Sequence, residues 1–234
     1  MTEFDTTLNG LNWVDIRMQL DAEGHAVLPG LLGADVARRL AGQTTALAAS
    51  RTTLESMDLG RGELFYFGAG MPAPLEQWRV ALYRRLVVVA NHWNETLGVG
   101  QRYPAEIEDF LLRNRKAGQM SSQSYLSRLG VDGHMALHQR NDDEEVFPLQ
   151  IVALLSEPGA DFEGGEFVMV EQRPRMQSRP SVLPFKLGDA AIIATAERPF
   201  KGTKGYYRVN LKHAISRVRK GERIGLELSF HDAL

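Results

Sequence analysis

The sequence predicts an α+β fold in which helices come first and a β-sandwich or jelly-roll barrel follows. Up to about residue 120, apolar residues recur at helical spacing in several segments. Beyond that point, short β-type runs alternate with glycine, proline and acidic turns, a pattern typical of a sandwich or barrel. We therefore expect one domain over residues 1–234, with 1–120 as mainly helical support and 121–234 as the jelly-roll core.

Helices are expected at 11–23, 34–50, 74–97 and 104–117. The clearest is 74–97, because its leucine, valine and tryptophan residues keep one face apolar. Proline suits the first turn of a helix, which accounts for Pro74 and Pro104, and glycine commonly follows the last turn, which accounts for Gly118. The run HAVLPGLL, which begins at His25, is expected to form a short strand.

Length and composition are those of an ordinary globular protein and exclude several kinds of site. The chain has 234 residues, 44% hydrophobic and 24% charged, with a formal net charge of -2, so whole-chain charge indicates neither a nucleic-acid nor a membrane binder. It has no cysteine, which excludes disulfides, thiolate metal sites and a cysteine nucleophile. Its N-terminal segment is unlike a signal peptide, and no apolar run approaches the roughly 18 residues that cross a bilayer. We therefore expect a cytoplasmic protein with no membrane partner.

Two histidines stand in β-type segments that are far apart in the sequence. His138 is followed by Gln139, Arg140 and an acidic stretch, and His213 lies in YYRVNLKHAISRVRKGER. Histidines on two neighbouring strands are able to hold a metal ion between them. A lone histidine is more commonly a surface or core residue, and spacing alone does not show that these two meet. The residues by themselves leave both interpretations open.

Several further segments carry a resemblance to a known family. They are GRGEL at 60–64, ALYRRL at 81–86, VFPLQIVALLSEPGADFEGGEFVMVEQRPRMQSRP at 146–180, GDAAII at 188–193, and RPFKGTKGYYRVNLKHAISRVRKGER at 198–223 with FHDA after it. From about Gly24 onward the chain resembles the Fe(II)/2-oxoglutarate-dependent dioxygenases of the prolyl-hydroxylase-like type. Within them it is most similar to the bacterial branch of nucleic-acid oxygenases, which are thought to act on damaged DNA. The resemblance implies a double-stranded β-helix, a cupin-like jelly roll, with supporting N-terminal helices.

The resemblance also implies a cofactor site. In the family, two histidines and one carboxylate hold Fe(II) and leave positions open for 2-oxoglutarate and dioxygen. His138 matches the first histidine ligand and His213 the second. Arg223 matches the basic residue that binds the distal carboxylate of 2-oxoglutarate, a role that suits the fork of a guanidinium group. Fe(II) and 2-oxoglutarate are therefore the cofactors that the resemblance implies.

The sequence departs from the family at the carboxylate ligand. The family pattern is His-x-Asp, whereas this chain has His138-Gln139-Arg140, with the following VFPLQ still in step. Arginine stays protonated and cannot ligate a metal. A cation about 4 Å from a divalent ion costs about 8 kcal/mol at an effective dielectric near 20. Asp142 or Asp143 could replace the ligand, or the two histidines could hold iron alone. We assign Arg140 as a candidate catalytic residue that binds an anionic substrate or a carboxylate beside the vacant position.

Two functions of different classes follow from this reading. The first is an oxygenase that couples oxidative decarboxylation of 2-oxoglutarate to oxidation of a C–H bond or an N-alkyl group in a small-molecule substrate, anionic or a nucleobase. Leu129, where relatives carry a tyrosine of the cofactor pocket, indicates altered chemistry in such an enzyme. The second is a non-catalytic pseudoenzyme that binds a small anion or a partner in the jelly-roll pocket.

A nucleic-acid partner is suggested by a basic stretch near the C-terminus. Residues 201–223 contain eight lysines and arginines, and Glu222 is the one acid within the stretch. Clustered cations contact phosphates, and the aromatic runs at 65–67 and 206–207 would be available to stack on single-stranded bases. The alternative is a solvated pair of strands whose cations are balanced by the acids at 142–145.

Overall fold

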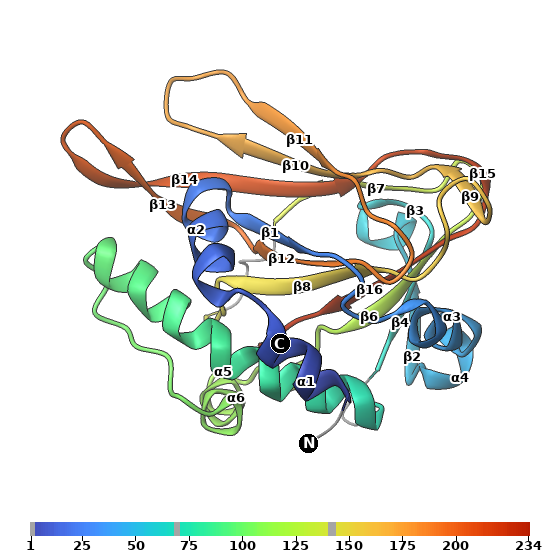
Figure 1. Ribbon diagram of the computed structural model, residues 1–234, viewed down its shortest axis with the longest axis horizontal. Coiled ribbons are helices and arrows are strands. Elements are labelled where there is room, and N and C mark those ends of the chain that lie inside the picture. The colour runs from blue at the N-terminus through green and yellow to red at the C-terminus, as the bar shows by residue number, and fades with distance from the viewer. Residues whose placement is uncertain (1–2, 68–70, 140–143) are drawn as a thin grey trace.

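Figure 1 shows the computed structural model, which describes residues 3–67, 71–139 and 144–234. The helices are α1 (Glu3–Gly10), α2 (Trp13–Glu23), α3 (Ala34–Gly42), α4 (Thr44–Leu47), α5 (Ala73–Thr96) and α6 (Ile107–Lys116). The strands are β1 (His25–Leu28), β2 (Ser50–Thr53), β3 (Gly60–Arg61), β4 (Glu63–Tyr66), β5 (Ser121–Ser122), β6 (Tyr125–Leu129), β7 (His134–His138), β8 (Leu149–Leu154), β9 (Phe162–Gly164), β10 (Phe167–Gln172), β11 (Arg179–Leu183), β12 (Ala190–Ala194), β13 (Glu197–Gly202), β14 (Gly205–Ile215), β15 (Val218–Gly221), β16 (Arg223–Leu228) and β17 (Asp232–Ala233).

Most strands form two facing sheets, with helices against one of them, while β9 pairs with β15 and β5 with β17 in two short separate sheets (Figure 1). Within the described residues, the larger sheet has the order β1-β12-β8-β16-β6-β4-β2 and the second has the order β11-β10-β14-β7-β3, with β13 paired to β14. All of these pairings are antiparallel, and strands far apart in the sequence, such as β8 with β16 and β7 with β14, are neighbours, as in a jelly roll. The predicted α+β jelly roll is confirmed.

The N-terminal part of the chain contributes strands as well as helices. β1 pairs with β12, β4 pairs with β6 and β2 with β4 in the larger sheet, while β3 pairs with β7 in the second. The expected helices at 11–23, 74–97 and 104–117 correspond to α2, α5 and α6, and the expected helix at 34–50 is divided into α3 and α4. The jelly roll therefore draws on residues before 121.

Helices α1, α5 and α6 lie on the face of the larger sheet that is turned away from the second sheet (Figure 1). The apolar face of α5 is buried there, with Leu82, Leu86 and Trp93 at most 2% exposed. Aromatic rings join this helix to α6 and to the sheet, with centroids 5.0 to 6.1 Å apart among Tyr83, Phe110, Phe147 and Phe230. None of the described helices is long and apolar enough to span a membrane.

Glycine is required where α2 turns into β1. Gly24 has a φ of 74°, in the left-handed region that glycine adopts without strain, and its N–H donates to the carbonyl of Leu20 at 2.9 Å. A Cβ at this position would lie 2.6 Å from Cδ1 of Leu211 on β14. The close approach holds α2 and β1 beside the strand that carries His213.

Candidate metal and anion site

The structure brings His138 and His213 together inside the jelly roll. β7 and β14 are neighbours, and their register sets the two histidines directly opposite each other. The ring centroids are 4.2 Å apart with a tilt of 55°, and the residues are 9% and 1% exposed. The register shifts between His213 and Ile215, a bulge of the kind that re-aims side chains. Strand pairing thus gathers two buried imidazoles at one point.

Hydrogen bonding determines which nitrogen of His138 is available as a ligand. Its Nδ1 lies 2.8 Å from the carbonyl oxygen of Ala136, and because a carbonyl only accepts, Nδ1 carries the proton. The lone pair is therefore on Nε2, a buried atom. Metal-binding histidines commonly donate one ring N–H to a backbone carbonyl and bind the metal through the other nitrogen.

Two polar side chains of the larger sheet approach His213 from the opposite side of the barrel. Gln150 on β8 and Glu227 on β16 are 0% and 5% exposed. The Nε2 atom of His213 lies 3.3 Å from Nε2 of Gln150 and 3.9 Å from Oε2 of Glu227. Among the described residues, Oε1 of Gln150 is buried without a hydrogen-bond partner. Because such an acceptor is costly, this oxygen marks a point where a ligand or an ordered water would donate.

Arg223 lies on the same inward face of β16 as Glu227, since alternate residues of a strand share a face. It is 3% exposed, and its Nε donates to the carbonyl of Gly165 at 2.8 Å. Burial lowers the pKa of the guanidinium to about 10, which leaves it charged at neutral pH, and the nearby Tyr125 opposes that shift. No carboxylate of the described residues forms an ion pair with it. A buried cation without an acidic partner among the described residues favours the binding of an anion.

A small cavity lies beside Arg223 and Glu227. Its volume is about 20 Å³, and its walls include Tyr125, Ser127 and the side chain of Met135. Such a space has room for about one water, so a dicarboxylate enters only when flexible side chains such as Met135 move. A larger cleft, of about 640 Å³, lies between α3 and the start of α5 and contains none of these residues.

Some residues of the predicted site lie elsewhere or outside the described residues. Arg140, Asp142 and Asp143 fall in the gap at 140–143, so their predicted roles stay predictions. Leu129 is fully buried on β6, where it pairs with Arg223 in the β6–β16 register.

Sequence reasoning missed Gln150, Glu227 and Tyr125. A signal for Glu227 was present in the run RIGLELSF, in which an acid shares the alternation of Arg223 inside an otherwise apolar strand. Gln150 stands in the same way within the apolar run FPLQIVALL. Polar residues in strands that are buried on both faces indicate side chains directed into a site.

The gathered side chains meet part of the needs of an iron site that is held by two histidines and a carboxylate. The facing imidazoles, the tautomer of His138 and the unsatisfied oxygen of Gln150 fit such a site. Within the described part of the chain, however, no three histidine, cysteine or acidic side chains converge closely enough to hold an ion. Two nitrogen ligands fit, and the carboxylate ligand is not in place.

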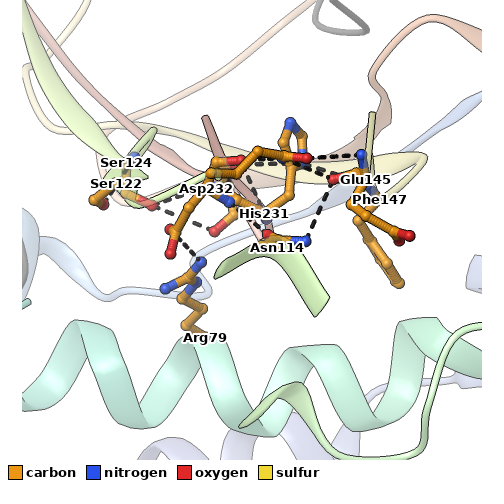
Figure 2. Close-up of polar contacts among 10 residues, drawn as sticks. Arg79, Asn114, Ser122, Ser124, Glu145, Phe147, His231 and Asp232 are labelled. Carbon is orange, nitrogen blue, oxygen red and sulfur yellow. Dashed lines mark hydrogen bonds and ion pairs between the residues drawn. The ribbon is translucent and has the colours of Figure 1, made fainter. Parts of the chain in front are cut away.

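A hydrogen-bonded cluster fixes the strand that carries Gln150 (Figure 2). The backbone N–H of Phe147, just before β8, donates to Nδ1 of His231 at 3.3 Å. The neighbouring Asp232 donates its N–H to Oδ1 of Asn114 at 2.8 Å and pairs with Arg79 at 3.4 Å. These contacts join α5, α6 and the C-terminal segment to the start of β8, so the inner wall of the site has a rigid support.

The basic stretch at 201–223 is partly neutralised by acids, two from other strands and one from the turn between β6 and β7. The ion pairs are Arg208 with Glu197 at 3.2 Å, Arg217 with Asp132 at 3.5 Å and Lys220 with Glu163 at 3.0 Å. Lys201 and Tyr206 are paired in the β13–β14 hairpin, and Tyr206 is 53% exposed. Phe65 and Phe67 are 2% exposed, so the expectation that they stack on bases is wrong: both belong to the core.

Known proteins share this architecture and much of this sequence. A family model described as an oxygenase that catalyses oxidative methylation of damaged DNA matches residues 62–233. An uncharacterised protein from two strains of Mycobacterium tuberculosis is 39% identical over 166 residues, which cover 69% of this chain and 71% of the relative. A prolyl-4-hydroxylase from Pseudomonas putida aligns with a TM-score of 0.56 and 12% identity over 92% of this chain and 96% of its own. An oxidoreductase of the 2OG-Fe(II) oxygenase family from Burkholderia pseudomallei aligns with a TM-score of 0.56 and 16% identity over 96% and 94%. The double-stranded β-helix is thereby confirmed.

Proposed function

The chain belongs to the oxygenase family described as catalysing oxidative methylation of damaged DNA. From this premise we propose that it is a 2-oxoglutarate-dependent dioxygenase that oxidises an alkylated nucleobase. His138 and His213 would hold Fe(II), the metal that the family implies, and Arg223 would hold 2-oxoglutarate. The match to the family favours this function over a pocket that only binds an anion or a partner.

The observation that carries the proposal is the buried charge of Arg223. The guanidinium is 3% exposed, and no described carboxylate forms an ion pair with it. A dicarboxylate cofactor supplies the missing anion and the bidentate geometry that a guanidinium fork prefers. The cavity beside Arg223 is also lined by Glu227, whose Oε2 is 3.9 Å from Nε2 of His213, so a movement of Met135 would extend the anion site toward the histidine pair.

The chain's own groups have distinct tasks in this proposal. Fe(II) together with 2-oxoglutarate supplies the oxidation of a C–H bond or N-alkyl group, coupled to decarboxylation of the cofactor. Ala136 holds the proton of His138 on Nδ1 and so keeps Nε2 basic. Phe167, stacked on the ring of His213 at 5.8 Å, fixes its orientation and excludes water from that side. Arg223 orients the cofactor and neutralises its distal carboxylate.

The proposal is tested by following 2-oxoglutarate by NMR in the presence of Fe(II), ascorbate and air. We expect consumption that depends on Fe(II) and rises when a single-stranded oligonucleotide with N-methylated bases is added. Mass spectrometry of the oligonucleotide should show loss of methyl groups. The proposal would be contradicted if 2-oxoglutarate neither bound to the protein, as measured by calorimetry, nor was consumed under any of these conditions.

Arg140 is expected to weaken metal binding, and Arg140→Asp is expected to strengthen it. The replacement removes a cation from the neighbourhood of a divalent ion and restores the carboxylate of the family pattern, which at an effective dielectric near 20 is worth several kcal/mol. We expect the affinity for Mn(II), measured by calorimetry, to rise by roughly two orders of magnitude. Arg179→Asp makes the same charge change at an exposed strand position and should leave the affinity unchanged. An unchanged Arg140→Asp affinity would mean that position 140 does not face the ion.

A nucleic-acid substrate predicts salt-dependent binding through the β13–β14 hairpin. Lys201 stands opposite the exposed Tyr206, which together offer a phosphate contact and a stacking surface. Lys201→Ala should reduce the slope of log affinity against log salt for single-stranded DNA by about one. The exposed Lys116 on α6 provides the control, since Lys116→Ala should leave the slope as it is. Binding that does not depend on salt would remove nucleic acid from the proposal.

A further inference from the structure

The second sheet continues beyond the barrel as two hairpins. β10 and β11 form one hairpin, β13 and β14 form the other, and both project from the same end of the molecule (Figure 1). β10 pairs with β14 as far as Gln172 opposite Asn210, so the two hairpins share one base. Gln139, the residue after His138, donates its side-chain amide to the carbonyl of Leu211 at 3.0 Å. The base of the hairpins therefore adjoins the segment that follows the histidine pair.

Ion pairs and an aromatic ring fix the two hairpins to each other. Glu171 on β10 forms ion pairs with Arg173, at 2.6 Å, and with Arg198 on β13. Both guanidinium groups lie over the ring of Phe200, 4.0 and 5.5 Å from its centroid. Because these contacts join β10 to β13, the hairpins have a fixed position relative to each other.

The hairpins carry an excess of positive charge. Residues 172–186 and 198–212 contain no acid, and the flanking Glu171 and Glu197 already form ion pairs with arginines. Four exposed cations near the tips form no ion pair with a described acid: Arg175 and Arg179 in the first hairpin, and Lys201 and Lys204 in the second. Clustered cations without acidic partners attract a polyanion, and phosphate contacts of this kind do not depend on base sequence.

We propose that the β10–β11 hairpin is a second phosphate-binding arm, which together with the β13–β14 hairpin holds a single nucleic-acid strand beside the histidine pair. The inference rests on the proposed function, because the bound strand would carry the base that is oxidised. Arg175 and Arg179 would contact phosphates, and Met176, which is 50% exposed, would lie against a sugar or a base. Lys201 and Tyr206 would then belong to one of two arms.

The burial of the histidine pair favours a single strand over a duplex. His138 and His213 are 9% and 1% exposed, so a base that is stacked and paired in a duplex does not reach them unless it leaves the stack. Tyr206 precedes His213 by seven residues of β14, about 23 Å at roughly 3.3 Å per residue. This span corresponds to about seven nucleotides at roughly 3.4 Å each, a length that fits known single-strand sites.

The test is the salt dependence of single-stranded DNA binding by the intact protein, measured by fluorescence anisotropy. The double variant Arg175→Gln/Arg179→Gln should lower the slope of log affinity against log salt by about 1.4, because each phosphate contact of a single strand contributes roughly 0.7. Lys116→Gln/Lys186→Gln removes two exposed cations that lie away from the hairpin tips and should leave the slope unchanged. A duplex of the same sequence should bind more weakly than the single strand.

The outcomes separate the second arm from the proposed function. If both double variants have the wild-type slope, the second arm is overturned, whereas 2-oxoglutarate consumption by the wild type would leave the proposed function standing. If the wild type binds single-stranded DNA through the arm but consumes no 2-oxoglutarate, the arm stands and the proposed function fails. Wild type that binds no single-stranded DNA at low salt overturns the arm and the nucleic-acid substrate together.

Two further measurements complete the test. Tighter binding to vesicles of anionic lipid than to single-stranded DNA would assign the cations to another polyanion and overturn the proposal. Melting curves show whether each variant is folded, and because the changed side chains are exposed, no loss of stability is expected. If the double variant is not folded, Arg175→Gln alone should lower the slope by about 0.7, and an unchanged slope would overturn the arm.

Discussion

His213→Ala is expected to abolish metal binding and 2-oxoglutarate consumption while leaving a folded protein. The variant removes one of the two nitrogen ligands, and Mn(II) affinity should fall at least 100-fold, because even outer-shell partners of a ligand change affinity by roughly 10- to 100-fold. His213 is 1% exposed and stacked on Phe167, so its truncation also leaves a small cavity. The loss of stability should be about 2–4 kcal/mol, as for other buried truncations. EPR of bound Mn(II) and NMR of 2-oxoglutarate measure the two losses.

The matched control is His134→Ala. His134 lies on β7 four residues before His138, yet it is exposed, so its removal should change neither metal affinity nor turnover. A melting curve separates the cavity from the lost ligand, since the metal-dependent shift should vanish only in His213→Ala. Wild-type Mn(II) affinity in His213→Ala would move the ion away from the histidine pair altogether.

The fold could be predicted from local patterns because most elements carry their own signals. The apolar face of 74–97 and the proline at its start are properties of neighbouring residues, and α5 (Ala73–Thr96) follows them closely. The strands before residue 70 were harder to predict from the sequence. β3 (Gly60–Arg61) is two residues long and exists because it pairs with β7, so no local pattern announces it. Pairing between strands that are far apart in the sequence depends on tertiary structure, so the hydrophobic periodicity of either strand does not predict it.

The candidate site was likewise predictable only in part. The resemblance named His138, His213 and Arg223, and the structure brings the two histidines into register across β7 and β14. Glu227 and Gln150 were missed because their importance lies in facing His213 from the opposite sheet. The distance between residues of two sheets depends on how the sheets stack, which no single strand encodes. An acid inside an apolar strand is the one local sign that would have pointed to Glu227.

Arg223→Met is expected to raise the stability of the protein without cofactor and to abolish its response to 2-oxoglutarate. Burial in the folded state lowers the pKa of Arg223 from its ordinary value to about 10. A shift of this size corresponds to about 3 kcal/mol that the charged form costs the folded state. Because the unfolded state holds the proton more tightly, stability should rise as the pH increases above about 10, and the cost is fully present at neutral pH. Methionine removes the cost, while the lost guanidinium should weaken 2-oxoglutarate binding on the order of 100-fold.

Arg198→Met is the comparison variant, and its expected change in stability has the opposite sign. Arg198 is 1% exposed, as buried as Arg223, but it forms an ion pair with Glu171 and donates to the carbonyl of Asp21 at 2.8 Å. Its removal leaves the nearly buried Glu171 with Arg173 as its remaining ion-pair partner among the described residues, and should cost about 1.5–3 kcal/mol for the lost charged hydrogen bonds. The melting temperature is measured with and without 2-oxoglutarate and Mn(II). For Arg223→Met it should rise without ligand and no longer increase when 2-oxoglutarate is added. For Arg198→Met it should fall without ligand but still increase when 2-oxoglutarate is added. A buried arginine that stabilises the structure and one that binds a ligand therefore differ in both the change of melting temperature and the response to 2-oxoglutarate. If Arg223→Met is destabilised and still responds to 2-oxoglutarate, Arg223 is a structural residue and does not bind the cofactor.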